Sequence, residues 1–323
     1  MVVDGGIMKV TGSDGDTTIN ASIPVSDAVG GHALILPRPL VSFLTTLTTD
    51  QMVTIESSAQ QDEVVVSPAG SSPYRFRTVA STFPQAAPPS GEPVPVDFKE
   101  LPAGLASART AVSKENPVIQ LVSDESGLTL HATDNYRLAR VHLSNSGFGD
   151  FSGILPLQVL DRVAKMNTSQ IVVDGSARVI SFISVDVVLS TRLLSVPFPA
   201  VEGVLGALPP HKAVLPSAQL LQACSRLAAI TESSPVKCIL TSNSLVLNVA
   251  NADLGSGAEE VPVTSNDGAG DFEFLARLGY IQDAVVATGA ESVVLFYSGS
   301  VQPLFVKSDG GLDILTVVMP VRG

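Results

Sequence analysis

The stretch that decides the fold runs from His131 to Arg140 and reads HATDNYRLAR. An alternating run, Leu128-Thr129-Leu130, leads into it, and a polar Thr-Asp-Asn segment then interrupts the alternation. Aspartate and asparagine side chains supply the local hydrogen bonds of a turn, so the pattern predicts a tight β-hairpin whose second strand covers 137–141. Taken alone, such a hairpin is an ordinary surface feature, and its meaning depends on the rest of the chain.

The composition predicts a strand-rich protein of two or three domains. The chain has 323 residues, of which 45% are hydrophobic and 5% aromatic, and it has no tryptophan. Its cores must therefore be built from aliphatic residues, and valine and threonine in short alternating runs favour strands. No apolar run reaches the roughly 18 residues of a membrane-spanning helix, and the first residues do not resemble a signal peptide. Two cysteines, Cys224 and Cys238, indicate reduced thiols rather than a disulfide framework, so we expect a cytoplasmic protein.

A pattern of one helix followed by one short strand occurs three times. Ile35-Leu36-Pro37 opens the first copy and Ile154-Leu155-Pro156 opens the second. The copies predict helices over 40–47, 159–166 and 280–286, and strands over 52–55, 171–173 and 293–295. Because the copies recur at nearly constant spacing, they indicate tandem homologous domains.

A second, amphipathic type of helix is predicted over 98–112 and again over 215–230. Apolar residues recur at intervals of three and four in both segments, as in helices that pack on a sheet. Arg109 and Arg226 occupy matching polar positions, and Cys224 falls on an apolar face, where we expect it to be buried.

Two proline-rich segments, 85–96 and 206–212, predict linkers, because proline cannot continue a helix or a central strand. The predicted domains are 1–90, 93–209 and 210–323. The first is shorter than the others by about one helix and one strand, and we expect its sheet to expose apolar residues. A start codon assigned too late and a truncated copy of the domain are both compatible with this difference.

Patterns of catalytic or metal-binding residues are not recognisable in the sequence. The histidines, His32, His131, His142 and His211, lack the spacing of metal ligands, and there is no nucleophile elbow, phosphate-binding loop or dinucleotide fingerprint. Asp14-Gly15-Asp16 predicts a hairpin turn rather than a calcium loop, because no acidic residue follows at the twelfth position. We therefore expect no enzyme, no metal and no cofactor.

Three segments in this order resemble those that form the peptide pocket of the bacterial sliding clamp, the β subunit of DNA polymerase III. They are the hairpin at 132–139, the segment Phe198-Pro199-Ala200-Val201-Glu202-Gly203-Val204-Leu205, and the final residues from Val317 to Gly323. The resemblance implies an α+β fold of three tandem DNA-clamp domains, in which helices pack on antiparallel sheets. It also implies a homodimer joined head to tail into a ring, a non-enzymatic processivity factor that encircles duplex DNA.

The resemblance further implies that the replicative polymerase and the clamp loader dock short peptides of Gln-x-x-Leu-Phe type between the second and third domains. The residues that match the pocket motif are Thr133, Tyr136, Arg137, Leu138, Pro199, Val204, Val317, Met319, Pro320 and Arg322. Weaker matches are Ile119, Arg277, Tyr280 and Pro303. An apolar cleft with a few polar groups at its rim suits such peptides, and methionine accommodates varied partners.

A formal net charge of −12 argues against a protein that binds DNA tightly by neutralising phosphates, but not against a ring that retains DNA by topology. In such a ring the basic residues of the helices would face DNA: Arg109, Lys114, Arg162, Lys165 and Arg226. We expect the ring to close by edge-to-edge pairing of the strand at 74–77 with the strand at 236–239 of a second chain.

Two other functions stay open at this point. A truncated or paralogous clamp would bind partner peptides without forming a closed ring on DNA. A hydrolase or lectin built on repeated β-rich domains is disfavoured, because no catalytic cluster and few aromatic residues are present.

Overall fold

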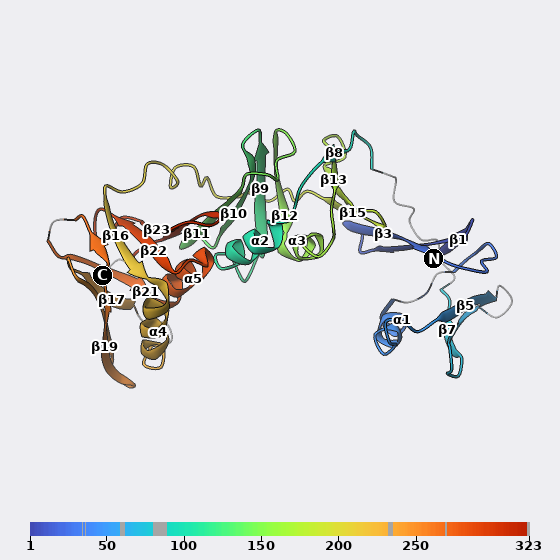
Figure 1. Ribbon diagram of the computed structural model, residues 1–323, viewed down its shortest axis with the longest axis horizontal. Helices are drawn as coiled ribbons and strands as arrows, with labels where there is room; N and C mark the ends of the chain where they lie inside the picture. The colour runs from blue at the N-terminus through green and yellow to red at the C-terminus, as the bar shows by residue number, and fades with distance from the viewer. Residues whose placement is uncertain are drawn as a thin grey trace. The chain divides into compact units, whose positions relative to one another are not determined.

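The computed structural model describes residues 1–33, 35, 37–58, 62–79, 89–231, 235–268 and 270–321 (Figure 1). The chain forms two compact units, one of residues 1–92 and 172–192 and the other of residues 93–171 and 193–323. Leu36 and residues 85–88 of the first predicted linker lie outside the described residues. The predicted domain boundaries do not coincide with these two units and stay a prediction.

In its described part, the first unit contains one helix and strands that pair in antiparallel fashion. Strands of the first repeat pair with β15 (Val187–Arg192), in the order β4-β1-β2-β3-β15-β14, and β5-β6-β7 form a small second sheet. The elements are β1 (Val2–Asp4), β2 (Ile7–Ser13), β3 (Thr17–Pro24), β4 (Gly31–His32), α1 (Pro37–Leu44), β5 (Val53–Ser58), β6 (Glu63–Pro68), β7 (Tyr74–Arg77) and β14 (Val179–Ile183). Val2, Ile7 and Ile23 on strands β1, β2 and β3 are exposed, in line with the expectation that the sheet of the first repeat exposes apolar residues.

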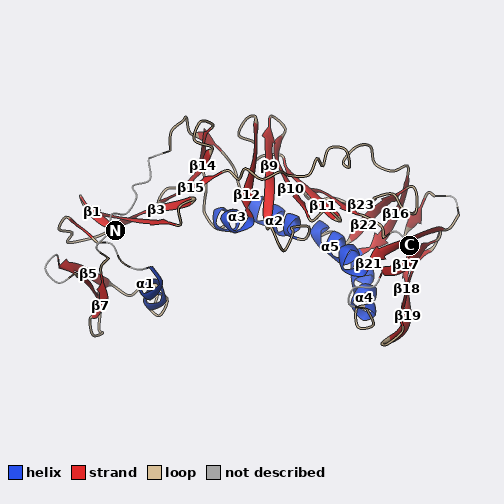
Figure 2. Ribbon diagram, turned by 180° about the vertical axis from the view of Figure 1, so that it is seen from behind, coloured by secondary structure: helices blue, strands red, loops and turns tan. Residues whose placement is uncertain are grey.

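The second unit contains four helices in its described part. Figure 2 shows them along one side of the strands, where α2 packs on β10 and β11, and α5 packs on β24. The helices are α2 (Leu101–Arg109), α3 (Leu157–Val163), α4 (Ser217–Leu227) and α5 (Leu278–Thr288). They confirm the helices predicted over 98–112, 159–166, 215–230 and 280–286.

Most strands of the second unit belong to one nine-stranded sheet of order β12-β9-β10-β11-β24-β23-β22-β16-β20. A four-stranded sheet of order β19-β18-β17-β21 lies in the third repeat, and β8 pairs with β13. The bounds are β8 (Val94–Pro95), β9 (Val118–Asp124), β10 (Gly127–Thr133), β11 (Arg137–Leu143), β12 (Phe151–Pro156), β13 (Gln170–Asp174), β16 (His211–Pro216), β17 (Pro235–Leu240), β18 (Ser244–Asn251), β19 (Gly255–Pro262), β20 (Ser265–Asn266), β21 (Phe272–Arg277), β22 (Ser292–Tyr297), β23 (Leu304–Ser308) and β24 (Asp313–Val318).

The end of the predicted linker forms a short strand: Val94-Pro95 pairs with Ile171 and Gln170 as β8, which proline tolerates because the strand lies at a sheet edge. One expectation about strands is wrong. The strand at 236–239, expected to be free for a second chain, is β17, which already pairs with β18 and β21. Its alternating pattern identifies a strand but cannot reveal which strands lie beside it.

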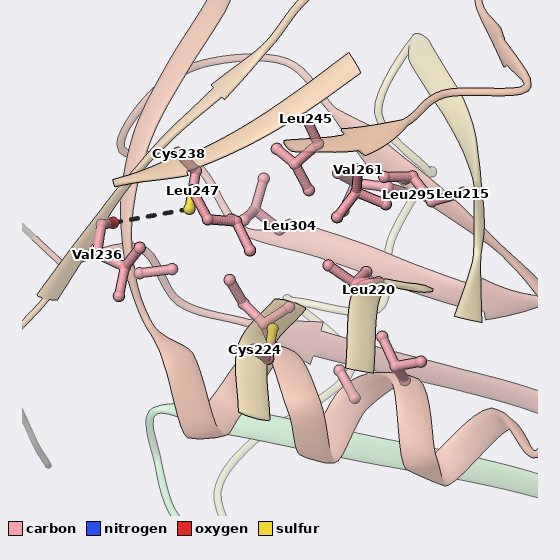
Figure 3. Packing of buried hydrophobic residues seen from close by; sticks show 14 of the residues in the cluster. Leu215, Leu220, Cys224, Val236, Cys238, Leu245, Leu247, Val261, Leu295 and Leu304 are labelled. Carbon is pink, nitrogen blue, oxygen red and sulfur yellow. Dashed lines mark hydrogen bonds between the residues drawn. The ribbon is translucent and has the colours of Figure 1, made fainter. Parts of the chain in front are cut away.

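The core of the third repeat encloses both cysteines (Figure 3). Cys224 on α4 and Cys238 on β17 have no exposed surface, and the Cys238 thiol donates a weak hydrogen bond to the Val236 carbonyl oxygen at 3.6 Å. Burial raises the pKa of Cys224 to about 12 and raises the pKa of Cys238 as well, because a thiolate is poorly solvated among apolar side chains. Both thiols therefore pack in the core and are unreactive.

Neither cysteine should react with a water-soluble thiol reagent in the native protein at pH 8, because only an accessible thiolate attacks. Both should react fully in urea. A Val185→Cys variant is the control, since Val185 is 94% exposed and its replacement should add one rapidly reacting thiol. Rapid native-state reaction of the unaltered protein would contradict the buried arrangement.

Within the described residues, no helix is long and apolar enough to cross a membrane. In the same part of the chain, no group of three or more His, Cys, Asp or Glu residues is arranged to hold a metal ion.

Candidate functional site

The turn between β10 and β11 is fixed by its own side chains. One carboxylate oxygen of Asp134 accepts hydrogen bonds from the backbone N–H groups of Tyr136 and Arg137, both at 3.0 Å. The Thr133 hydroxyl donates to the Arg137 carbonyl at 2.7 Å and accepts from the Asn135 N–H at 3.0 Å. Asn135 has φ 72°, a left-handed conformation that asparagine adopts more readily than most residues. The predicted hairpin is confirmed.

This hairpin joins the second repeat to the third, because β11 pairs with the C-terminal strand β24. Leu138 lies opposite Val317 and Arg137 opposite Val318, and the Met319 N–H donates to the Tyr136 carbonyl at 2.9 Å. Successive side chains of a strand point to opposite faces. Leu138 and Val317 therefore share one face, while Arg137 and Val318 share the face that carries the helices.

Arg137 links the hairpin to α5. Its Nε lies 2.9 Å from an Asp134 carboxylate oxygen, and its Nη1 donates to Asp283. Its guanidinium carbon is 4.7 Å from the centre of the Tyr280 ring, within the range of a cation–π contact. The Arg137 side chain is only 13% exposed and that of Asp134 16%, so this pair is largely removed from water.

Tyr136, Arg277 and the half-buried Tyr280 lie together beside the hairpin, and with Met319, which follows β24, they form what we call the junction surface. The Tyr136 and Tyr280 rings stack with their centres 6.4 Å apart. Tyr136 is 59% exposed and Met319 38% exposed. A partly apolar surface of this kind can contact the side chains of an extended peptide.

The opposite face of the same joint carries a closed apolar cluster. Leu138, Phe305, Leu315 and Val317 are buried there beneath Val201. Phe198, Val204 and Leu205 pack around this cluster and are partly buried. The backbone N–H groups of Val204 and Leu205 both donate to the Val201 carbonyl, which folds the 198–205 segment against the sheet.

A small cavity at the joint has a volume of about 10 Å³, close to the space of a single water molecule. Its lining includes Arg137, Leu138, Tyr280 and Val318.

The structure brings most of the predicted pocket residues to this joint. Thr133, Tyr136, Arg137 and Leu138 come from the hairpin; Val317, Met319 and Pro320 come from β24 and the residues after it; and Val204 packs on the cluster. Pro199 is exposed and Pro303 half-buried. Ile119 has no exposed surface, because it faces the core from β9. Arg322 lies outside the described residues.

Asp283 was not assigned a role from the sequence, although it is the carboxylate that ties α5 to the hairpin. It stands 146 residues after Arg137. No local pattern signals a pairing across that distance.

His131 on β10 is a buried polar residue beside the apolar cluster. Burial lowers its pKa to about 4, against the opposing effect of the Glu202 carboxylate, and Arg140 lowers it further. Its Nδ1 lies 3.3 Å from the side-chain oxygen of Gln120. The imidazole is therefore neutral at pH 7 and serves the packing of the sheet.

The predicted DNA-facing residues fall into two groups. Arg109 is paired with Asp161, and Arg226 makes two hydrogen bonds to Glu259 at 2.7 and 2.6 Å. Arg109, Arg162 and Arg226 each lie in the last turn of a helix, where a cation is favoured by the helix dipole. Lys114, Arg162 and Lys165 are exposed and make no ion pair with another described residue.

Replacing Arg137 with glutamine should lower the free energy of unfolding by about 2 to 3 kcal/mol, because Asp134 then loses its charged partner in a poorly solvated position. The measurement is urea denaturation followed by tyrosine fluorescence. Lys99→Gln is the control, because the Lys99–Asp97 pair is solvent exposed and its loss should leave the transition unchanged. Equal effects of the two substitutions would contradict the role given to Arg137.

No family model matches the chain. The β sliding clamp of Micrococcus luteus is 24% identical over 281 residues, which cover 82% of this chain and 88% of that protein.

Two solved structures are similar to this chain over its whole length. The DNA polymerase sliding clamp of Pseudomonas aeruginosa superposes with a TM-score of 0.88 at 23% identity, covering 100% of this chain and 91% of that one. The DNA polymerase III β subunit of Thermotoga maritima gives a TM-score of 0.88 at 21% identity, covering 100% and 90%. The expected α+β fold of three repeated domains is confirmed, as is the resemblance from which it was inferred.

Proposed function

We propose that this chain is a DNA sliding clamp, a processivity factor that encircles duplex DNA and tethers the replicative polymerase and other partners. One observation carries the proposal: a clamp fold matches the whole chain, and the hairpin, the 198–205 segment and the C-terminal strand meet at one joint within it. The function is mechanical and requires no catalytic group. The hydrolase and lectin alternatives gain no support from this fold.

Partner peptides of Gln-x-x-Leu-Phe type are the proposed ligands of the joint, with the polymerase and the clamp loader as their carriers. Tyr136 and Met319 offer exposed apolar contacts, and the β11–β24 pairing holds them on a rigid sheet. The leucine and phenylalanine of the peptide would pack against the Leu138–Val317 cluster after the 198–205 segment moves away from it. Few backbone hydrogen bonds hold that segment, which keeps the cost of its movement low.

A fluorescein-labelled Gln-x-x-Leu-Phe peptide should bind with micromolar affinity in an anisotropy titration. Met319→Ala should weaken binding about five- to tenfold, the effect of losing one or two buried methylene groups. Val185→Ala, which removes an exposed apolar side chain from the other compact unit, should leave the affinity unchanged. Absence of binding by the unaltered protein would remove the peptide site from the proposal.

A head-to-tail homodimer is the proposed assembly. The strands that would pair between the two chains are those at the edges of their sheets. The sheet β5-β6-β7 ends in β7, and the sheet β19-β18-β17-β21 ends in β19. Exposed Arg77 on β7 has the opposite charge to exposed Glu260 on β19, next to Arg75 and Glu259, which are paired with Glu63 and Arg226 within the chain. Unpaired edges of complementary charge are suited to edge-to-edge addition, and two such contacts related by a twofold axis close a ring.

Charge reversal on either edge should give monomers in sedimentation velocity. One variant carries Arg75→Glu and Arg77→Glu, and the other carries Glu259→Arg and Glu260→Arg. Each alone places like charges at both of its contacts. An equimolar mixture should form dimers again, because every contact then joins opposite charges. Mixtures that stay monomeric, or single variants that stay dimeric, would exclude the β7–β19 contact.

DNA is the proposed cargo of the ring, held by topology with weak, sequence-independent contacts to phosphates. Lys114, Arg162 and Lys165 are the best candidates, because their charges are not neutralised by described carboxylates. Arg109 and Arg226 remain candidates with less free charge, since Asp161 and Glu259 bind them.

Replacing Lys114, Arg162 and Lys165 together with glutamine should flatten the salt dependence of DNA binding. Each phosphate contact contributes about 0.9 to the slope of log affinity against log salt concentration, so the slope should fall by up to about 2.7. Arg226→Gln is the matched control and should change the slope less. A slope that is equal in all three proteins would exclude these contacts.

A further inference from the structure

One face of the β2–β3 hairpin in the first unit is apolar, yet its side chains are not buried. We call it the open face. The residues that point to it lie opposite one another in three pairs: Met8–Ile23, Val10–Ala21 and Gly12–Ile19. Ile23 is 42% exposed, and the other apolar side chains of the set are half-buried. A sheet face of this composition is normally covered in a folded protein.

The second repeat contains the same three pairs in a buried setting. Adding 120 to each residue number gives pairs that have the same register on β10 and β11: Leu128–Leu143, Leu130–Val141 and Ala132–Ala139. None of these residues has any exposed surface. The helix α2 covers them, and it comes so close that a Cβ atom added to Gly104 would lie 3.0 Å from Leu143 Cδ2 and 3.3 Å from Val141 Cγ1 (Figure 2).

The third repeat repeats the arrangement with another helix. The helix α4 packs on β19, where Gly257 lies against Leu227 and Ile230. Two repeats therefore cover the equivalent face with an amphipathic helix. The partial exposure of the open face shows that no described helix covers it in the way that α2 covers β10 and β11. Its register and its composition are those of a helix-binding face.

The charges around the open face are negative. The turn between β2 and β3 carries Asp14 and Asp16, and Asp27 and Asp186 lie near the other end of these strands. All four are exposed and none forms an ion pair with a described residue. Lys9 points to the opposite face, because its neighbours in the strand point to the open face. A partner with basic groups beside its apolar ones complements such a rim.

We propose that the open face binds an amphipathic helix of a partner protein, with leucine and small residues on its apolar side and lysine or arginine on its polar side. The apolar side follows the pattern of α2, in which Leu101, Leu105 and Ala108 are buried around Gly104. The helix lays these residues on the sheet, and its basic residues contact the acidic rim. This binding does not rest on the peptide site, which lies in the other compact unit.

The test uses peptides derived from the helix that covers the matching face. The parent peptide has the sequence of residues 98–112, acetylated and amidated, with fluorescein on an added cysteine. A lysine peptide and a glutamate peptide carry the respective residue in place of both Ala103 and Ala106, which are exposed on α2. A fourth peptide carries Leu105→Asn on the apolar side.

Three proteins are compared as the 323-residue chain in anisotropy titrations. They are the unaltered protein, Ile23→Asn on the open face, and Val2→Asn as the matched control. Val2 is 50% exposed and lies opposite Lys9, so it points to the other face of the same sheet. Both substitutions are neutral and leave the charge of the rim unchanged.

The unaltered protein should bind the lysine peptide about three- to tenfold more tightly than the glutamate peptide in low salt, and the difference should shrink in high salt. Ile23→Asn in the protein and Leu105→Asn in the peptide should each weaken binding about tenfold, because an amide would be buried against apolar side chains. Val2→Asn should stay within about twofold of the unaltered protein.

The outcomes separate the helix site from its alternatives. Failure of both the parent and the lysine peptide to bind, or equal loss of affinity in Ile23→Asn and Val2→Asn, would overturn the helix site. Equal affinity for the lysine and glutamate peptides would overturn the basic partner. Self-association of the unaltered chain that Ile23→Asn abolishes in sedimentation velocity would show that a second copy covers the open face, and would also overturn the proposal.

Discussion

The antiparallel pairing of β11 with β24 is the contact on which the second unit depends. It joins a hairpin of the second repeat to the last strand of the third and makes one nine-stranded sheet from both. The register places Leu138 opposite Val317 and Arg137 opposite Val318. Because successive side chains of a strand point to opposite faces, this register places the apolar cluster on one face and the ion pairs of Arg137 on the other.

Each face then has a separate physical role. On the apolar face, the 198–205 segment covers Leu138 and Val317, and their burial stabilises the joint. In the proposed function, a partner peptide would displace this segment and contact the two residues. The helical face fixes Arg137 between Asp134 and Asp283, so that α5 and the hairpin stay in a defined relation. Tyr136 and Met319 directly flank the paired strands, and the Tyr136 ring stacks on Tyr280 of α5, so all three are held beside the joint.

The features predicted correctly from the sequence are local or repeated. The hairpin follows from the Thr133-Asp134-Asn135 turn, and helices α2 to α5 follow from apolar spacing that recurs between copies. The β11–β24 pairing, the ion pair of Arg137 with Asp283 and the burial of Val317 join residues far apart in the chain, and spacing alone could not supply them. The interior position of β17 was missed for the same reason, since alternation does not reveal strand order. The resemblance to clamps compensated for part of this, because it identified the segments that meet at the joint.

The most direct test of the account is retention on circular DNA. The labelled protein is loaded onto a nicked circular plasmid by a clamp loader with ATP, and the complex is passed through a gel-filtration column in high salt to remove weakly bound protein. Half of the complex is then cut once with a restriction enzyme and chromatographed again. The account predicts that the protein stays with the circle and leaves the linear molecule by sliding off its ends. Equal retention on both forms, or loss from both, would contradict a closed ring and would favour a clamp-like protein that binds peptides without encircling DNA.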